Sequence, residues 1–540
     1  DQLIKNVFHN AGKIVKTLSR YEPIEVAENE LVRVMEYLAF IRRNGHKDEF
    51  FLNNSTAPKE FDALVSYLPR NEPLYSLVNE ALIPSLMHKE AVVVVHDAVW
   101  DSNLFRDLGR AIGLKSFLPE PPKSNGDGSQ RKSEWYNPDS QLNPIFKHVT
   151  AINFADQVKL KRPLAREAVA VLQTKADGRT LELEKVRDVL IGDHADPEGN
   201  AELLKKLEAA IEIKPAHVVA QVEKLFIKSI KSRVDSIVFA GGIDDARVKL
   251  SEFKSDEGKI ILVGTGGGLN PIIFTKSVPI EDAVEAVIEA TLKNSGQYCT
   301  NPCSILFEGE EAREQLFLEL LAERLAQVPI GSYKDEVARN KVGPLSSADE
   351  KNWDALAAFA AKHAKSIFVS SKFSREWRAL GEEVVNPTIF RMPLAEVGPN
   401  LKQHFAPFLI VQRFSDQNEL VHTFFCEEKK RGSGESEQVP RSEYFDKAMY
   451  VYFYGSTSER ARFIDSLNEV QSKLSGIEEG FFVHPAETVM HNKNLNTPGV
   501  ETGRFQYGGY GYDTTFILDE AGNSISKPFY VMEAVKFAGH

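Results

Sequence analysis

The sequence predicts an α/β fold whose core is a parallel sheet covered by helices. Apolar side chains recur at helical spacing across residues 28–43 and again across residues 75–87. Residues 91–95 then form a short run of Ala and Val, which is typical of a buried strand. A third helical pattern covers residues 103–112. Helices that alternate with buried strands in this way are typical of a doubly wound sheet.

The middle of the chain continues this alternation after a long loop. Residues 119–144 are rich in Pro, Ser, Gly, Asn and Gln, which is a composition typical of loops. Helical periodicity follows at residues 181–191, 200–213 and 217–230. Residues 234–240 then carry the pattern of another strand.

Composition and charge indicate a globular protein that does not bind nucleic acid. With 540 residues, 42% hydrophobic and 26% charged, the chain is expected to form two or three domains. Its net charge of −12 disfavours binding to nucleic acids or anionic membranes. We interpret the basic residues 224–233 as one solvated helix face. The charged, Gly- and Ser-containing residues 427–441 predict a disordered surface loop.

Cysteine content and hydropathy predict a cytoplasmic location. The only cysteines are Cys299, Cys303 and Cys426, which are too few for a secreted disulfide framework. The longest apolar runs are far shorter than a membrane span, and residues 1–20 lack the apolar core of a signal peptide. We therefore expect no membrane partner.

A glycine-rich segment follows a further predicted strand. Residues 259–263 are apolar, and Gly264-Thr265-Gly266-Gly267-Gly268 comes directly after them. A loop that cradles phosphate should open a helix, whereas residues 269–274 are rich in β-forming side chains. We therefore interpret the glycines as a tight crossing of the backbone near a site, and a nucleotide loop is the less favoured alternative.

Cys299 lies where a nucleophile could be positioned. Residues 279–292 predict an amphipathic helix, which leads into Asn294-Ser295-Gly296-Gln297-Tyr298-Cys299. Backbone dipoles can activate a Cys at such a junction, but free Cys is also among the most buried residue types. These residues alone therefore leave a nucleophile and a packing residue equally favoured. Cys299 and Cys303 lack convincing further ligands, so no metal site is predicted.

Several short motifs follow one another in an order that known enzymes share. They are Asn71-Glu72-Pro73, Val238-Phe239-Ala240-Gly241-Gly242, Gly267-Gly268-Leu269-Asn270-Pro271, Gly296-Gln297-Tyr298-Cys299, Asn386-Pro387-Thr388-Ile389-Phe390, Phe405-Ala406-Pro407 and Phe505-Gln506-Tyr507-Gly508-Gly509-Tyr510. In this order the chain resembles the aldehyde dehydrogenase superfamily, and the ordered set is more specific than any single motif. The resemblance implies an aldehyde-dehydrogenase-like α/β fold with a Rossmann-type cofactor domain, an α/β catalytic domain and a small β-extension.

The resemblance also implies a covalent mechanism that uses NAD or NADP. Cys299 would attack the carbonyl carbon to form a thiohemiacetal, and loss of hydride would leave a thioester. The oxyanion would accept hydrogen bonds from the Asn71 side chain and the Cys299 backbone N–H. Without the resemblance, Asn71 would favour a helix cap. The cofactor would lie against Gly241, Gly242, Thr265, Gly266, Gln403 and Phe405.

The chain departs from the family pattern at Glu72, where the family's Asn-Phe-Pro has Phe, and at three further places. Thr265 replaces the Glu that activates water in hydrolytic members, and a Thr hydroxyl cannot act as that base near pH 7. Gln403 replaces the Glu that usually binds the nicotinamide ribose. Asp97-Ala98-Val99 replaces the usual Pro-Ser-Glu. Cofactor affinity and the choice between NAD and NADP therefore stay open.

Two functions are consistent with these residues. The first is an NAD(P)-dependent oxidoreductase for a small-molecule aldehyde or, in reverse, an acyl thioester, and Thr265 favours acyl transfer to a thiol. The second is a non-catalytic protein of the same fold that serves binding or assembly. The retained Cys299 and Asn71 favour the enzyme, and cofactor binding would distinguish the two.

We expect three domains and a homo-oligomer. Residues 1–274 are predicted to form the cofactor domain, with an inserted or remodelled segment at about residues 119–230. Residues 275–490 would form the catalytic domain, and residues 491–540 a C-terminal β-extension to which residues 50–66 could contribute. Because such an extension resembles the family's oligomerisation element, a dimer or tetramer is expected.

Overall fold

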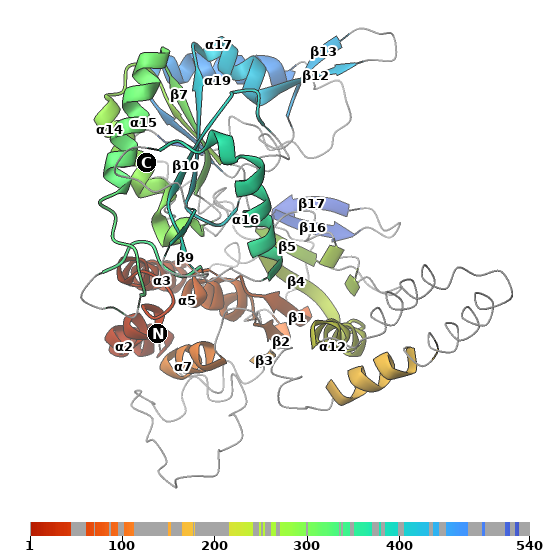
Figure 1. Cartoon of the computed structure of the whole chain (residues 1–540). Coiled ribbons are helices and arrows are strands. Elements are labelled where there is room, and N and C mark those ends of the chain that lie inside the picture. Colours follow the sequence, from red (N-terminus) through yellow and green to blue (C-terminus); the bar gives the residue numbers. More distant parts are fainter. Residues whose placement is uncertain are drawn as a thin grey trace, which may run out of the picture.

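Two main sheets, each flanked by helices, form the framework of the computed structural model, and Figure 1 shows one above the other. The structure describes residues 2–44, 61–69, 71–85, 88–95, 102–112, 149–152, 165–175, 178, 215–240, 248–249, 252–253, 261–265, 270–298, 301–333, 335, 339–345, 350–369, 377–379, 384–397, 404–430, 436–441, 450–472, 489–491, 514–518 and 524–528. The predicted helices at residues 181–191 and 200–213 lie outside these ranges.

The first sheet is doubly wound, as the sequence predicted. Its order is β17-β16-β5-β4-β1-β2-β3, and the chain order reverses at β1, which pairs in parallel with β2 and β4. At one edge β16 pairs antiparallel with β5. Its strands are β1 (Phe61–Tyr67), β2 (His88–Val94), β3 (Val149–Ile152), β4 (Val234–Ala240), β5 (Ile261–Thr265), β16 (Thr514–Leu518) and β17 (Ser524–Pro528).

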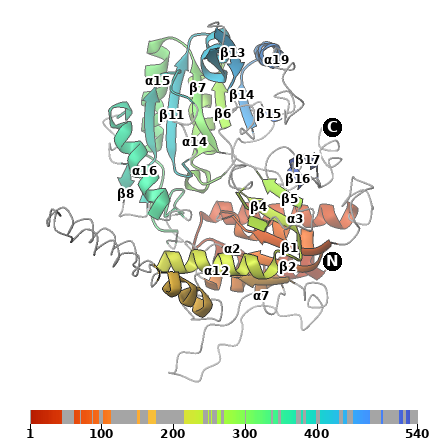
Figure 2. The same ribbon diagram turned by 90° about the vertical axis from the view of Figure 1, so that its right-hand side faces the viewer.

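Both faces of the first sheet are buried, which explains its apolar strands. Val65 of β1 belongs to a core cluster with Val222 of helix α12 (Pro215–Ile230). The preceding residue, Leu64, belongs to a different core cluster, which includes Leu108 of α7 (Ser102–Ile112). Figure 2 shows α12 and α7 beside the strands.

Helices near the N-terminus complete the first layer. They are α1 (Gln2–His9), α2 (Ala11–Leu18), α3 (Ile24–Asn44), α5 (Pro73–Ser76), η1 (Leu77–Leu82) and α6 (Ile83–Ser85). Helix α3 contacts α5, and Figures 1 and 2 show α3 on the side of this layer nearest to the second sheet.

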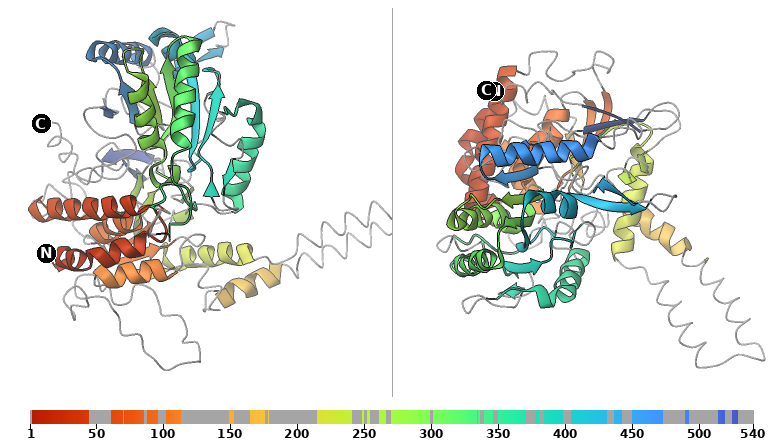
Figure 3. Two further views of the ribbon diagram at one scale, coloured as in Figure 1. Left: turned by 60° about the vertical axis from the view of Figure 1, so that its left-hand side comes forward. Right: turned by 90° about the horizontal axis from the view of Figure 1, so that it is seen from above.

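The second sheet is parallel throughout its described pairs and has the order β10-β11-β7-β6-β14-β15. On one face Phe307 stacks on Phe317 of α15 at 4.4 Å, and on the other Phe453 stacks on Phe463 of α19 at 5.3 Å. Figure 3 shows α14 and α15 side by side on this sheet. Its elements are β6 (Asn270–Phe274), α14 (Ile280–Thr291), η2 (Lys293–Gly296), β7 (Pro302–Glu308), α15 (Glu311–Leu325), α16 (Glu350–Lys362), η3 (Ala364–Ser366), β10 (Thr388–Met392), β11 (Phe408–Phe414), α17 (Gln417–Glu419), η5 (Leu420–Phe425), β14 (Tyr450–Tyr454), α19 (Thr457–Ser472) and β15 (Val489–His491).

Two short antiparallel pairs lie outside these sheets, and one of them corrects a prediction. The predicted disordered loop at residues 427–441 is wrong, because β12 (Cys426–Lys430) and β13 (Ser436–Pro440) form a hairpin. Charged composition indicates exposure, but a ladder depends on backbone hydrogen bonds and needs few apolar anchors. Here Cys426 and Val439 are buried. The other pair is β8 (Arg378–Ala379) with β9 (Val384–Val385).

Residues 61–66 correct a second expectation. They do not contribute to a peripheral β-extension but form most of β1, at the centre of the first sheet, where Ala63 and Val65 are buried. The C-terminal strands β16 and β17 extend the edge of that same sheet. The chain passes from the first sheet to the second between Thr265 and Asn270, and the domain boundaries near 274 and 490 stay predictions. Among the helices that the structure describes, none has the length and apolar character needed to span a bilayer.

Candidate active site

Asn71 follows the central strand of the first sheet. Strand β1 ends at Tyr67, and α5 begins at Pro73, whose fixed φ suits the first turn of a helix. The N-cap position of α5 is held by Glu72, which has φ 52° and ψ 61°. Asn71 lies one residue earlier and is buried. The Glu72 side chain makes no capping hydrogen bond, and the role of Asn71 as a site residue stays a prediction.

The segment that leads to Cys299 is a tight left-handed turn. After α14 ends at Thr291, Asn294, Ser295 and Gly296 all have positive φ, at 48°, 55° and 78°. Gln297 Nε2 donates to the Asn294 carbonyl at 3.0 Å, inside the turn. Such conformations are unfavourable for residues with side chains and persist where the surroundings fix them.

Hydrogen bonds from other segments hold this turn on both sides of the predicted nucleophile. The Ser295 hydroxyl contacts the Tyr333 hydroxyl and accepts from the Gly343 N–H at 3.0 Å. Asn301 N donates to the Tyr298 carbonyl at 3.1 Å. Cys299 and Thr300 lie outside the described residues, but the residues that flank them are fixed.

Gly296 brings the Cys299 motif against the Phe405 motif. A Cβ atom at Gly296 would lie 2.5 Å from the Ala406 carbonyl carbon and 2.8 Å from Pro407 N, so the two backbones touch. Phe405 has φ 47° at the start of this second loop. Only glycine allows such an approach.

The Asn386 motif joins the same site. Thr388 N donates to the Pro407 carbonyl at 3.0 Å, and Thr388 Oγ1 donates to the Asn386 carbonyl at 2.8 Å. Strands β7, β11 and β10 are neighbours in the second sheet, which carries these three motifs to one place. Segments more than a hundred residues apart in sequence therefore meet around the turn before Cys299.

Most of the predicted cofactor residues follow the carboxyl ends of the first sheet. Gly241 and Gly242 come directly after β4, and Gly266 directly after β5, whose last residue, Thr265, pairs with Ala240. Parallel strands end at the same edge, and dinucleotides bind there beside the strand where the order reverses. Gly241, Gly242, Gly266 and Gln403 themselves lie outside the described residues, so their roles stay predictions.

Beside Asn71 the structure reveals buried charges that the sequence analysis did not identify. Glu22, Glu30, Arg33 and Glu72 are all less than a tenth exposed. Arg33 donates to the Glu72 carboxylate. Burial, followed by the charge of Glu72, raises the pKa of Glu30 to about 8. One sequence signal was available, because Glu72 stands where the family motif has Phe.

His404 lies between the site and an aromatic cluster. Its ring centroid is 4.2 Å from that of Phe359 and 5.9 Å from that of Phe408. This packing favours a structural role for His404. Within the described residues no group of His, Cys, Asp and Glu is arranged to hold a metal ion.

Comparison with known proteins agrees with the motifs. Residues 218–424 match the aldehyde dehydrogenase family. The chain is 26% identical over 272 residues to a lactaldehyde dehydrogenase of Methanococcus aeolicus, covering 50% of this chain and 52% of the relative. It is 25% identical over 194 residues to a betaine aldehyde dehydrogenase of Bacillus subtilis, covering 36% and 38%. The chain thus spans about half or less of the length of these relatives, and Asn71 lies outside the matched family region.

Solved structures share the fold. Lactaldehyde dehydrogenase from Escherichia coli superposes with a TM-score of 0.54 at 12% identity, covering 96% of this chain and 84% of that one. Glyceraldehyde-3-phosphate dehydrogenase GapN from Methanocaldococcus jannaschii, complexed with NADP, superposes with a TM-score of 0.52 at 13% identity, covering 98% and 88%. The resemblance and the fold class predicted from the sequence are therefore confirmed.

Proposed function

We propose that this chain, which carries an aldehyde dehydrogenase family domain, is an NAD(P)-dependent oxidoreductase that acts on an aldehyde or, in reverse, on an acyl thioester. The observation that carries the proposal is the close contact of Gly296 with Ala406 and Pro407, because it assembles the family motifs around the segment before Cys299. The names of the relatives support an aldehyde as the substrate class.

Each residue of the site has a role in this reaction. The Cys299 thiolate attacks the carbonyl carbon, and the carbonyl oxygen becomes an oxyanion in the thiohemiacetal. The Asn71 amide and the Cys299 backbone N–H donate to this oxyanion. When the thioester forms, the carbonyl is restored and both donors hold its oxygen. The buried turn around Gly296 excludes water and fixes the direction of attack.

The first sheet fits a dinucleotide. Its parallel strands have the order β5-β4-β1-β2-β3, and in such sheets dinucleotides bind at the carboxyl ends of the strands, beside the point where the order reverses. Gly241, Gly242, Thr265, Gly266, Gln403 and Phe405 would hold NAD or NADP, which accepts the hydride when bound. Two structural neighbours are described as complexes with NADP and NAD, which supports this cofactor class.

A comparison of two cysteine variants tests the proposal. Cys299→Ser should abolish hydride transfer and retain cofactor binding, because a hydroxyl is a far poorer nucleophile than a thiolate. Cys303→Ser is the matched control and should keep its activity. Titration with NAD(H) and NADP(H) measures cofactor binding, and mass spectrometry measures acylation of the protein. Equal losses in the two variants would reject Cys299, and a wild-type chain that binds neither cofactor would favour the non-catalytic alternative.

A further inference from the structure

The turn that carries Asn71 is held by buried charges from helix α3. Glu22, Glu30, Arg33 and Glu72, here called the charge cluster, are exposed by only 4%, 1%, 7% and 1%. Arg33 donates to the Glu72 carboxylate in an ion pair. Removing such charges from water is unfavourable, so a buried ion pair is weak evidence for stability, and in some proteins such a pair specifies a geometry.

Arg33 and Glu30 fix the backbone directly after Asn71. Glu72 has a left-handed conformation, with φ 52° and ψ 61°, which is unfavourable for a residue with a side chain. The Arg33 guanidinium, bound to Glu72, also lies 4.2 Å from the centre of the Tyr75 ring. Tyr75 N donates to Glu30 Oε1 at 2.8 Å. Helix α3 therefore holds residues 72–75 at both ends.

The charge cluster also acts on the segment that precedes Cys299. Burial, followed by the charge of Glu72, raises the pKa of the Tyr298 hydroxyl. Burial, followed by the charge of Arg33, lowers the pKa of Lys293. Such effects require short distances, because charges in a protein interact strongly only at close range.

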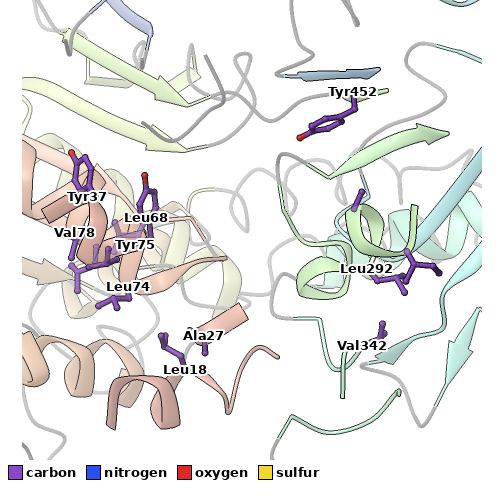
Figure 4. Close-up of a cluster of buried hydrophobic side chains, with 14 of the residues drawn as sticks. Leu18, Ala27, Tyr37, Leu68, Leu74, Tyr75, Val78, Leu292, Val342 and Tyr452 are labelled. Carbon is purple, nitrogen blue, oxygen red and sulfur yellow. The ribbon is translucent and has the colours of Figure 1, made fainter. Parts of the chain in front are cut away.

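Apolar packing surrounds the residues that follow the Asn71 turn. Leu74 and Tyr75 are fully buried and belong to one core cluster with Leu68 and Val78. Figure 4 shows these four side chains together, with Leu292 of the same cluster on the other side of the view. The charge cluster therefore lies beside a continuous core and not on a surface.

We propose that the Arg33–Glu72 ion pair is a positioning element of the oxyanion site: it fixes the left-handed turn that presents Asn71. Neither residue needs to touch the substrate. The inference rests on the proposed function, because it assumes that Asn71 and the Cys299 backbone serve the same oxyanion.

Two variants of the pair test this role by kinetics. Glu72→Gln removes the charge and keeps the shape, whereas Arg33→Lys keeps the charge and loses the planar group over Tyr75. Both should lower kcat for hydride transfer by about tenfold or more and change KM by less than about twofold, because misplacing a donor affects mainly the transition state. A KM effect with unchanged kcat would overturn the proposal.

Glu314→Gln is the matched control. Glu314 is also a buried carboxylate, exposed by 2%, and it accepts from Arg391 at 2.6 Å on the other layer. This variant should melt at a lower temperature but keep kcat per folded molecule. If Glu72→Gln behaved in the same way, the Arg33–Glu72 pair would be structural only and the proposal would be rejected.

Hydrogen exchange tests the fixing of the turn independently of catalysis. In full-length Glu72→Gln and Arg33→Lys, amide exchange should rise in peptides covering residues 71–76. In Glu314→Gln exchange in this segment should not change. Unchanged exchange of residues 71–76 in the two pair variants would overturn the proposal. A wild-type chain without turnover would reject the proposed function, while these exchange rates would still decide whether the pair fixes the turn.

Discussion

At the scale of single residues, the site depends on Gly296, because this position has no room for a side chain. Gly296→Ala would place a Cβ atom 2.5 Å from the Ala406 carbonyl in a turn with φ 78°. We expect a loss of about 2–4 kcal/mol in the free energy of unfolding, because overpacking and a left-handed alanine both oppose the fold. Hydride transfer should also fall. Urea unfolding and single-turnover kinetics measure the two effects.

Gly12→Ala is the control for this substitution. Gly12 lies inside α2, and a Cβ atom there would meet no heavy atom within 4 Å. The change should increase stability by about 0.5–1 kcal/mol, since alanine favours a helix more than glycine does. If both variants changed stability by a similar small amount, the close contact between the two loops would be wrong.

Asn71→Ala addresses the oxyanion at the same scale. Loss of one donor typically costs about 2.7–4 kcal/mol, so the chemical step should slow by roughly a hundredfold or more. Cofactor binding should stay unchanged, which fluorescence titration can establish. Asn79→Ala removes another buried amide, from η1, and should retain the rate. A lower melting temperature with normal turnover per folded molecule would show that Asn71 is structural.

At the scale of elements, helix α3 makes stability depend on pH. Burial and the charge of Glu72 raise the pKa of Glu30 to about 8, and Glu22 and Arg33 also act on it. Because the folded state holds this proton more tightly than the unfolded state, Glu30 lowers stability as pH rises from about 4.5 to about 8. Glu30→Gln should reduce this slope by an amount on the order of a few kcal/mol between the ends of the range, and Glu22, whose pKa burial also raises, should account for what remains. Urea unfolding at several pH values tests it, and parallel curves for the two proteins would contradict it.

Helix α3 also shows which elements the sequence could predict. Its apolar periodicity predicted a helix at residues 28–43, and the structure has α3 from Ile24 to Asn44. The same pattern places charged residues toward solvent, yet Glu30 and Arg33 are buried. Their partner, Glu72, lies far away in sequence, and periodicity reports nothing about such a contact. The hairpin at residues 426–440 was missed for a related reason, because its ladder does not require an apolar pattern.

At the scale of the whole molecule, the site was predicted by the order of motifs and assembled by sheet topology. The parallel neighbours β7, β11 and β10 bring Gly296, Pro407 and Thr388 together. No local pattern predicts this meeting, which depends on long-range strand pairing. The resemblance to the family predicted that these motifs share one site. The same resemblance could not reveal the Arg33–Glu72 pair, because Glu72 departs from the family motif.

In the proposed reaction, turnover depends on how the acyl group leaves Cys299. Thr265, the last residue of β5, replaces the carboxylate that activates water in hydrolytic relatives, and a hydroxyl cannot serve as that base near pH 7. Without a thiol acceptor, the native protein should therefore give a single burst of reduced cofactor and accumulate acylated Cys299. Addition of a thiol such as coenzyme A should restore steady turnover, which absorbance of the reduced cofactor and mass spectrometry can follow.

Two substitutions at position 265 separate charge from shape in this prediction. Thr265→Glu places a carboxylate where water can be activated, so steady hydrolysis should rise. Thr265→Gln has a similar size without the basic group, and it should behave like the native chain. Rapid, repeated oxidation of an aldehyde to the free acid by the native protein, with no thiol present, would reject acyl transfer to a thiol and assign the base to another residue.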